Sequence, residues 1–128
     1  MEDLEKQTFQ LISDMLSPEL AEALKNSGQS IEFAGYLGRL AFDNVFASLW
    51  SRPGLDRRSR SLVTLGMLIA MRATEELRFH IPAALKNGVT IKEIEEVIYH
   101  ASGYAGFPAA ASARQVALKV LTPPTSSS

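Results

Sequence analysis

Apolar residues recur with the period of an α-helix along most of the chain. No stretch alternates apolar and polar residues as a half-buried strand does, so the pattern does not predict a sheet. The first segment, residues 2–16, gathers its apolar side chains on one helical side: Leu4, Leu11, Ile12, Met15 and Leu16. We therefore predict an all-α fold, a compact subunit of about six to seven helices.

Capping and breaking residues divide this pattern into separate helices. The candidate N-caps are Ser17, Ser30, Asp56, Thr74 and Thr90, which open helices over about 18–26, 31–50, 57–72, 75–87 and 91–104. Thr90 and Glu93 have the spacing of a capping box, and Asn87-Gly88 is a good helix stop. Gly103, Gly106 and Pro108 break the chain before a last helix at about 107–121.

The helix predicted at 57–72 differs from the others. It begins with arginines and then becomes apolar on nearly every face. A helix that is hydrophobic all round belongs in the interior of a protein. We therefore predict that it is the central, buried helix of the core.

Size and composition indicate one domain. The chain has 128 residues, of which 46% are hydrophobic, and this is enough to bury a single core. We place that single domain at residues 1–121. The last seven residues, TPPTSSS at 122–128, are polar and proline-rich, and we predict a disordered tail.

Charge and cysteine content exclude several classes of function. Thirteen basic and 14 acidic residues give a net charge of -1, without the basic excess that nucleic acid requires. The opening MEDLEKQ does not resemble a signal peptide, and the longest apolar run, at 62–71, is too short to span a membrane. We expect a cytoplasmic protein with no nucleic-acid or membrane partner. The absence of cysteine excludes disulfide exchange and thiol catalysis.

The segment TEELRFHIPAALKNG, residues 74–88, contains the first candidate chemical group. Glu76 and His80 are four residues apart, so they share one face of the predicted helix. They are either an acid/base pair that faces a ligand or a structural histidine after first-turn acids, which favour a helix N-terminus. Pro82 removes a backbone N–H inside this helix and is expected to kink it.

The other histidine, His100, lies late in the sixth predicted helix, close to Tyr99 and Tyr104. The glycines that follow allow a helix or a ligand to approach closely. The alternative is that the two histidines are unrelated structural residues. A metal site made of Glu76, His80 and His100 is weakly supported, because their spacing matches no familiar metal motif.

Arginines at positions 57, 58 and 60 suggest an anion site at a helix start. Guanidinium groups and free backbone N–H groups attract carboxylates together. The plainer interpretation is a solvated helix end. Composition and spacing do not separate the two.

Several of these stretches occur together in one known family. WSRPGLDRRSRSLVTLGMLIA, EELRFH followed by AALKNGVT and EIEEV, and YHASGYAGFPAA closely resemble the carboxymuconolactone decarboxylase family in order and spacing. The similarity covers about residues 50–121. It departs from the family pattern at Phe46-Ala47, at Met71-Arg72 and at Pro82, which affects the substrate more than the fold.

The resemblance implies a helical subunit that forms a homo-oligomer, often a trimer or hexamer, with sites near subunit contacts. A thiol branch of the superfamily carries Cys-x-x-Cys before the histidine, but this chain has Ala73 and Glu76 at those positions. The branch that remains decarboxylates 4-carboxymuconolactone, a small lactone dicarboxylate, to 3-oxoadipate enol-lactone in protocatechuate breakdown. No cofactor is implied.

The resemblance also suggests roles for individual residues. Arg58 and Arg60 suit the binding of a dianion, and His80 is the best candidate proton donor with Glu76 beside it. His100 or Tyr104 suits hydrogen bonding to the lactone oxygen, and these roles are exchangeable. The alternatives are a decarboxylase of a related lactone acid, or a non-catalytic helical oligomer that binds a small acidic ligand or a protein partner.

Overall fold

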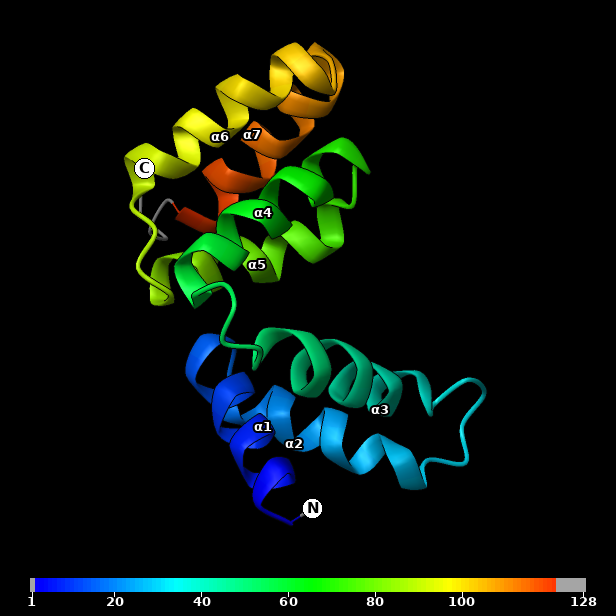
Figure 1. Ribbon diagram of the computed structural model, residues 1–128. Helices are drawn as coiled ribbons and strands as arrows, with labels where there is room; N and C mark the ends of the chain where they lie inside the picture. Colours follow the sequence, from blue (N-terminus) through cyan, green and yellow to red (C-terminus); the bar gives the residue numbers. More distant parts are fainter. Residues whose placement is uncertain (1, 122–128) are drawn as a thin grey trace, which may run out of the picture. The chain divides into compact units, whose positions relative to one another are not determined.

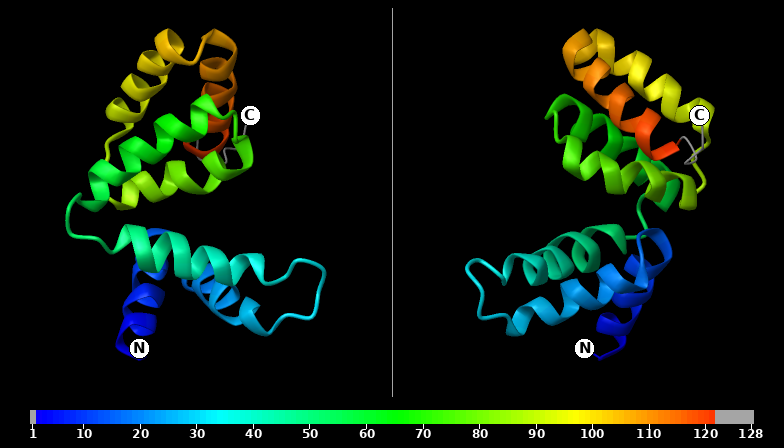
Figure 2. Two further views of the ribbon diagram at one scale, coloured as in Figure 1. Left: turned by 45° about the vertical axis from the view of Figure 1, so that its right-hand side comes forward. Right: turned by 180° about the vertical axis from the view of Figure 1, so that it is seen from behind.

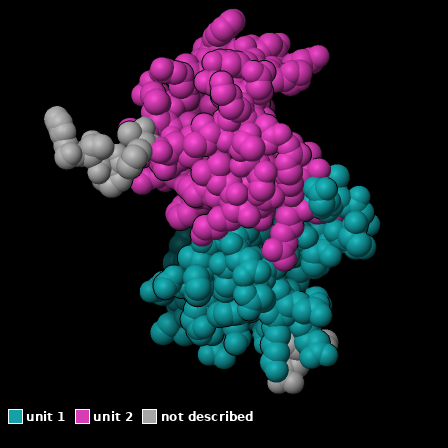
Figure 3. All heavy atoms as spheres, turned by 90° about the vertical axis from the view of Figure 1, so that its left-hand side faces the viewer, with its two compact units in different colours: residues 1–56 teal, residues 57–128 magenta. Residues whose placement is uncertain are grey.

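The computed structural model describes residues 2–121, and within them it contains seven α-helices and no strand (Figure 1). The all-α prediction is therefore confirmed. The chain divides into two compact units, with the boundary between Asp56 and Arg57 (Figure 3). The predicted single domain at 1–121 thus contains two centres of packing. The tail at 122–128, predicted to be disordered, lies outside the described residues.

Unit 1 contains three α-helices and two short segments of other helical types. They are α1 (Glu2–Met15), α2 (Pro18–Asn26), the 3₁₀ turn η1 (Ser27–Gln29), α3 (Leu37–Ala41) and the π-helix η2 (Phe42–Trp50). α1 packs against α2 and η2, and α2 also packs against α3. Ile12, Met15 and Phe42 are completely or almost completely buried. The prediction that Ser17 caps α2 is confirmed, because its hydroxyl accepts a bond from the Leu20 N–H.

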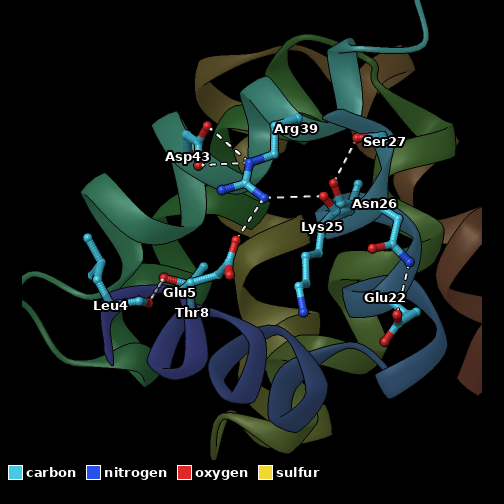
Figure 4. Close-up of polar contacts among 10 residues, drawn as sticks. Leu4, Glu5, Thr8, Glu22, Lys25, Asn26, Ser27, Arg39 and Asp43 are labelled. Carbon is cyan, nitrogen blue, oxygen red and sulfur yellow. Dashed lines mark hydrogen bonds and ion pairs between the residues drawn. The ribbon is translucent and has the colours of Figure 1, made fainter. Parts of the chain in front are cut away.

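Arg39 joins the helices of unit 1 (Figure 4). Its guanidinium donates to Glu5 on α1 at 3.0 Å and to the Lys25 carbonyl on α2 at 3.2 Å. It also pairs with Asp43, one turn further along its own helix, at 3.2 Å. The same group lies 4.7 Å from the Phe42 ring centre. One half-buried side chain on α3 therefore holds α1, α2 and η2 together.

The predicted third helix is too long at its start. Residues 31–36 form turns, and α-helix begins only at Leu37. The Ser30 hydroxyl accepts a bond from the Glu32 N–H at 3.1 Å, so it closes a turn and caps no helix. Ala34 has a φ of 56°, in the left-handed region, which ends any helix that would begin before it.

Unit 2 contains four α-helices: α4 (Arg57–Ala70), α5 (Thr74–Lys86), α6 (Ile91–Tyr104) and α7 (Phe107–Leu121). α4 and α7 each pack against both α5 and α6, and they also contact one another. α5 and α6 therefore occupy opposite corners of the bundle (Figure 2). α4 contacts the three other helices, but α7 does so too, and Val63 and Met67 on α4 are 49% and 55% exposed. The prediction that α4 is a buried central helix is therefore wrong, because one of its faces lies at the surface of the unit.

The core of unit 2 combines branched side chains with alanines. Leu65 and Ile69 from α4 meet Leu77 and Ile81 from α5, all at most 2% exposed. α7 contributes mainly small residues: Ala109, Ala113 and Ala117. Small side chains allow α7 to lie close to its neighbours, so four short helices enclose one continuous core.

The helix ends in unit 2 test the remaining boundary predictions. The capping box of Thr90 and Glu93 is confirmed, and Gly88 has the expected positive φ of 99°. The prediction for Thr74 is wrong, because Thr74 is the first helical residue and Ala73 occupies the cap position without a side-chain bond. Pro82 lies inside α5, within the helix that the sequence pattern predicts.

Candidate active site

The first candidate group lies on α5. Glu75 and Glu76 occupy its first turn, where carboxylates are favoured by the helix dipole and the unpaired N–H groups. His80 follows Glu76 by four residues, so both side chains project from one side of the helix. Glu76 is exposed and His80 is half-buried. A carboxylate at the solvent edge therefore stands beside an imidazole that is partly withdrawn from water.

The environment of His80 changes its protonation. Burial lowers the pKa of the His80 imidazole from its ordinary value, because a charged ring loses hydration. The negative charge of Glu76 acts in the opposite direction and raises this pKa, but by less than burial lowers it. In the free protein, His80 is consequently neutral at pH 7.

Asn87 shows which way this side of α5 faces. It lies seven residues, or about two turns, after His80 and so on the same side of the helix. Its side-chain amide donates to the Ser61 hydroxyl on α4 at 2.9 Å, and Ser61 is only 2% exposed. The side of α5 that carries Glu76 and His80 is therefore the side from which Asn87 reaches α4.

The second candidate group lines an open groove between α4 and α6. The groove has a volume of about 810 Å³. Its floor is apolar and consists mostly of small residues: Leu62, Gly66, Ala70, Val97 and Ala101. Its polar lining comes from one face of α6, where residues recur every three or four positions: Glu93, Glu96, His100 and Tyr104.

His100 and Tyr104 are stacked within this groove. Their ring centres are 5.0 Å apart with an interplanar angle of 31°. They are one helical turn apart, so the α-helix itself brings the rings together. Both are exposed, Tyr104 to 86%. Hydrogen-bond donors in this position are available to a ligand but are well hydrated in the single subunit.

Two arginines near the start of α4, Arg58 and Arg60, project from the helix in different directions. Arg58 forms an ion pair with Glu93 across to α6. Residues two apart on a helix project about 200° apart, so Arg60 leaves α4 on a different side. The two guanidinium groups therefore do not converge on one carboxylate. Arg58 is also already engaged by an acidic partner, contrary to the simple anion-site interpretation.

Glu93 has more contacts than the capping motif alone required. Its carboxylate accepts the Thr90 backbone N–H at 2.9 Å and also binds Arg58. The bond from the Thr90 N–H and the nearby positive charge hold the pKa of Glu93 below its usual value. Glu93 therefore remains ionised at the end of the groove and fixes the position of Arg58.

The predicted site residues thus fall into two groups within unit 2. His100, Tyr104 and, through Glu93, Arg58 belong to the α6 side, whereas Glu76 and His80 belong to the α5 side. Among residues 2–121, neither Glu76 nor His80 lines the groove. Within the same range, no three acidic or histidine side chains lie close enough together to hold a metal ion.

Sequence reasoning missed three residues of these groups: Ser61, Glu93 in its contact with Arg58, and Glu96. A helical projection from Glu93 would have found the groove face, because Glu96, His100 and Tyr104 follow it at intervals of three or four. Ser61 carries no such signal. A buried serine in an apolar helix is recognised only when its partner, Asn87, is placed opposite.

Comparison with known proteins identifies relatives of this chain. Residues 37–119 match the model of the carboxymuconolactone decarboxylase family. The chain is 45% identical over 89 residues to 4-carboxymuconolactone decarboxylase from Acinetobacter baylyi, covering 70% of this chain and 63% of that protein. It therefore spans less than two thirds of the length of that relative.

Two further relatives are more distant. The chain is 39% identical over 109 residues to nitrosuccinic acid decarboxylase from Metarhizium robertsii, covering 84% of this chain and 74% of that protein. It is 36% identical over 77 residues to an uncharacterized 15.0 kDa protein from Paracoccus denitrificans, covering 59% of this chain and 58% of that protein. In the part of the chain that the structure describes, no helix has the length and apolar character needed to cross a bilayer.

Proposed function

This chain belongs to the carboxymuconolactone decarboxylase family, and from that membership we propose that it is a carboxy-lyase for 4-carboxymuconolactone. The product is 3-oxoadipate enol-lactone, in the protocatechuate branch of aromatic breakdown. Two of the relatives are named as decarboxylases, which supports the reaction class. The single observation that supports it in the structure is the half-buried His80 with the Glu76 charge beside it.

The substrate supplies its own electron sink. When the carbon–carbon bond to the departing carboxylate breaks, its electron pair moves through the adjacent double bond onto the lactone carbonyl. Carbon dioxide leaves and a dienolate remains. A proton then adds to carbon and restores the lactone carbonyl. The protein has to bind a dianion, keep water away from the departing carboxylate, stabilise the oxyanion and supply that proton. No cofactor is required.

We assign the proton donor to His80 and its electrostatic support to Glu76. Without a ligand, His80 is neutral at pH 7 because burial lowers its pKa. A bound dicarboxylate brings negative charge close to the ring and raises this pKa, so substrate binding and proton uptake reinforce each other. Binding of the dianion therefore favours the charged form of the donor. This coupling is what a decarboxylase with a carbanionic intermediate needs.

His100 and Tyr104 are assigned to hydrogen bonding with the lactone oxygen. Arg58 and Arg60 leave α4 on different sides, so each is assigned to a different carboxylate of the substrate, and Arg58 has to exchange its ion pair with Glu93 for that contact. The stacked rings present an N–H and an O–H donor at the groove. Because α5 and α6 occupy opposite corners of one subunit, these donors serve the same substrate as His80 only across a contact between copies. The assignment therefore requires that the chain forms a homo-oligomer, and we propose a trimer or a hexamer.

A related acid is the second candidate substrate. The name of the Metarhizium relative specifies nitrosuccinic acid, a dicarboxylic acid whose nitro group can accept the electron pair released with carbon dioxide. Carboxymuconolactone and nitrosuccinic acid therefore share two features, namely two carboxylates and a built-in electron sink. The same His80 chemistry serves either compound. A non-catalytic oligomer that binds an acidic ligand is the remaining alternative.

A turnover assay tests the proposal. Purified, chelator-treated protein is incubated with 4-carboxymuconolactone, nitrosuccinate and succinate, and carbon dioxide release is measured. We expect release from the lactone above the rate without protein and none from succinate, which has two carboxylates but no electron sink. Carbon dioxide release from nitrosuccinate but not from the lactone would identify nitrosuccinate as the substrate. Binding of the acids without any release would leave the non-catalytic alternative.

A further inference from the structure

One end of the α4–α6 groove holds an ion pair whose two partners belong to different helices. Arg58 lies in the first turn of α4, and Glu93 lies in the first turn of α6 and lines the groove. The Arg58 Nη2 group donates to the Glu93 Oε2 atom. The proposed function needs the same guanidinium for a carboxylate of the substrate. Glu93 and a bound ligand therefore compete for one cation.

The two partners differ in how firmly they are held. The Glu93 Oε1 atom accepts the Thr90 backbone N–H at 2.9 Å, and the Glu93 N–H donates to the Thr90 hydroxyl at 3.1 Å. These capping bonds do not depend on Arg58. The Arg58 side chain is long and 43% exposed, so its guanidinium can move to a ligand or to water without breaking a buried contact. Glu93 is therefore the fixed partner and Arg58 the mobile one.

The turn between α5 and α6 leaves space beside the arginine. Gly88 lies in this turn with a φ of 99°, a conformation that favours glycine. A Cβ atom at Gly88 would lie 3.8 Å from the Arg58 Cδ atom. The arginine stem therefore passes over a residue that has no side chain to fix it in one rotamer. This local structure suits a guanidinium that exchanges one partner for another.

We propose that Glu93 is a specificity-determining residue, an internal carboxylate that occupies Arg58 until a carboxylate of the ligand replaces it. The inference rests on the proposed function and names the chemical group that the groove selects. A ligand carboxylate replaces one charge-assisted hydrogen bond by another, so the exchange loses little. A neutral ester or amide offers no charge and leaves Arg58 paired with Glu93. The groove therefore selects acids over their esters at this end.

The competition weakens binding of the substrate but assists release of the product. With Glu93 in place, every carboxylate has to displace it, so a ligand binds less tightly than Arg58 alone would allow. When the carboxylate that the product retains departs, Glu93 takes the guanidinium back. Tight binding of substrate and product alike does not raise kcat. Glu93 therefore acts on affinity through Arg58, and it does not act on the reacting atoms.

Titration calorimetry with succinate, a dicarboxylate without an electron sink, tests the exchange without turnover. Glu93→Gln removes the charge but keeps a side-chain oxygen for the Thr90 N–H, so the capping box survives. We expect the Kd for succinate to fall about two- to fivefold, the range that an exposed ion pair typically contributes, and the Kd for dimethyl succinate to stay unchanged. Glu96→Gln is the matched control, because it removes a charge from the same groove without releasing Arg58. It should change the Kd for succinate by less.

An Arg58→Gln background shows whether the gain in affinity acts through the arginine. In that background, Glu93→Gln should leave the Kd for succinate unchanged, because the guanidinium that it would release is missing. Melting temperatures check that each variant is folded.

Three results would overturn the inference: a gain that persists without Arg58, an equal gain from Glu96→Gln, or succinate binding that Glu93→Gln leaves undetectable, unchanged or weaker. The turnover assay separates these results from the proposed function. If the wild-type protein releases no carbon dioxide from the lactone or from nitrosuccinate while the Arg58-dependent gain is present, the exchange stands and the proposed function fails. If carbon dioxide is released but the gain is absent, only the inference about Glu93 fails.

Discussion

The α5 and α6 corners of unit 2 carry the same kind of residue in opposite environments. On α5, His80 is half-buried beside an exposed glutamate, and two turns further along the same helix Asn87 donates a hydrogen bond to Ser61 of α4. On α6, His100 is exposed, stacks on Tyr104 and lines an open groove. The two helices also begin differently, since α6 has a complete capping box and α5 has no side-chain cap.

The difference shows that environment decides what a histidine can do. Burial lowers the pKa of His80 and makes its protonation sensitive to any charge brought near it. An exposed ring such as His100 offers hydrogen bonds in competition with water, which makes each of them worth little. We therefore assign proton transfer to the α5 corner and binding to the α6 corner.

The largest effect is expected for His80→Asn. The amide keeps a polar group of similar size but cannot donate a proton as an imidazolium does. Because general acid catalysis contributes about 10²–10⁴-fold, kcat/KM for carbon dioxide release should fall by at least about 100-fold. The melting temperature serves as the control for folding. A folded variant that retains more than a tenth of wild-type activity would contradict the assignment of His80.

A smaller loss is expected for His100→Asn. A hydrogen bond in a hydrated groove contributes about 0.5–1.5 kcal/mol, so kcat/KM should fall by no more than about tenfold. The loss should appear mainly in KM, since the residue acts in binding. If His100→Asn lowers kcat more than His80→Asn does, the roles of the two corners are reversed.

The two helix starts make a matched pair for stability. Thr90→Ala removes a side-chain cap and should cost about 1 kcal/mol, which lowers the melting temperature by roughly 4–8 °C in a unit of this size. Thr74→Ala, at the start of α5, removes no cap and should cost less. Thermal denaturation of both variants measures the difference. An equal loss in both would mean that the Thr90 cap adds nothing.

The smallest effect is expected for Glu76→Gln, as a shift in pH dependence. The Glu76 charge raises the pKa of His80, so its removal lowers that pKa further. If protonated His80 is the donor, kcat/KM falls as the pH rises through this pKa, and in the variant the fall should move to lower pH. A profile that stays in place, or moves to higher pH, would remove Glu76 from the mechanism.

Much of the fold could be predicted from the sequence because its signals are local. Helical period, glycine stops and the Thr90 capping box predict both ends of all four helices of unit 2 within one or two residues. The error at Ser30 has a local cause. A serine or threonine hydroxyl can close a turn as readily as it caps a helix, and the choice depends on the backbone that follows, such as the left-handed Ala34.

The candidate site was less predictable because it depends on how the helices pack. Helical spacing placed Glu76 with His80 and His100 with Tyr104, since each pair belongs to a single helix. Spacing could not reveal that α5 and α6 occupy opposite corners, or that Glu93 engages Arg58. The apolar character of α4 was recognised, but the sequence could not indicate that one face would remain uncovered in the subunit.

The central claim, that burial on α5 provides the working imidazole, is tested most directly by proton NMR titration. With two histidines in the chain, the His80 ring signal is the one missing from His80→Asn. We predict a midpoint below the ordinary value of about 6.5 in the free protein, and a higher midpoint when a non-reactive dicarboxylate is bound. A midpoint at or above 6.5 in the free protein, or one that the dicarboxylate leaves unchanged, would contradict the account.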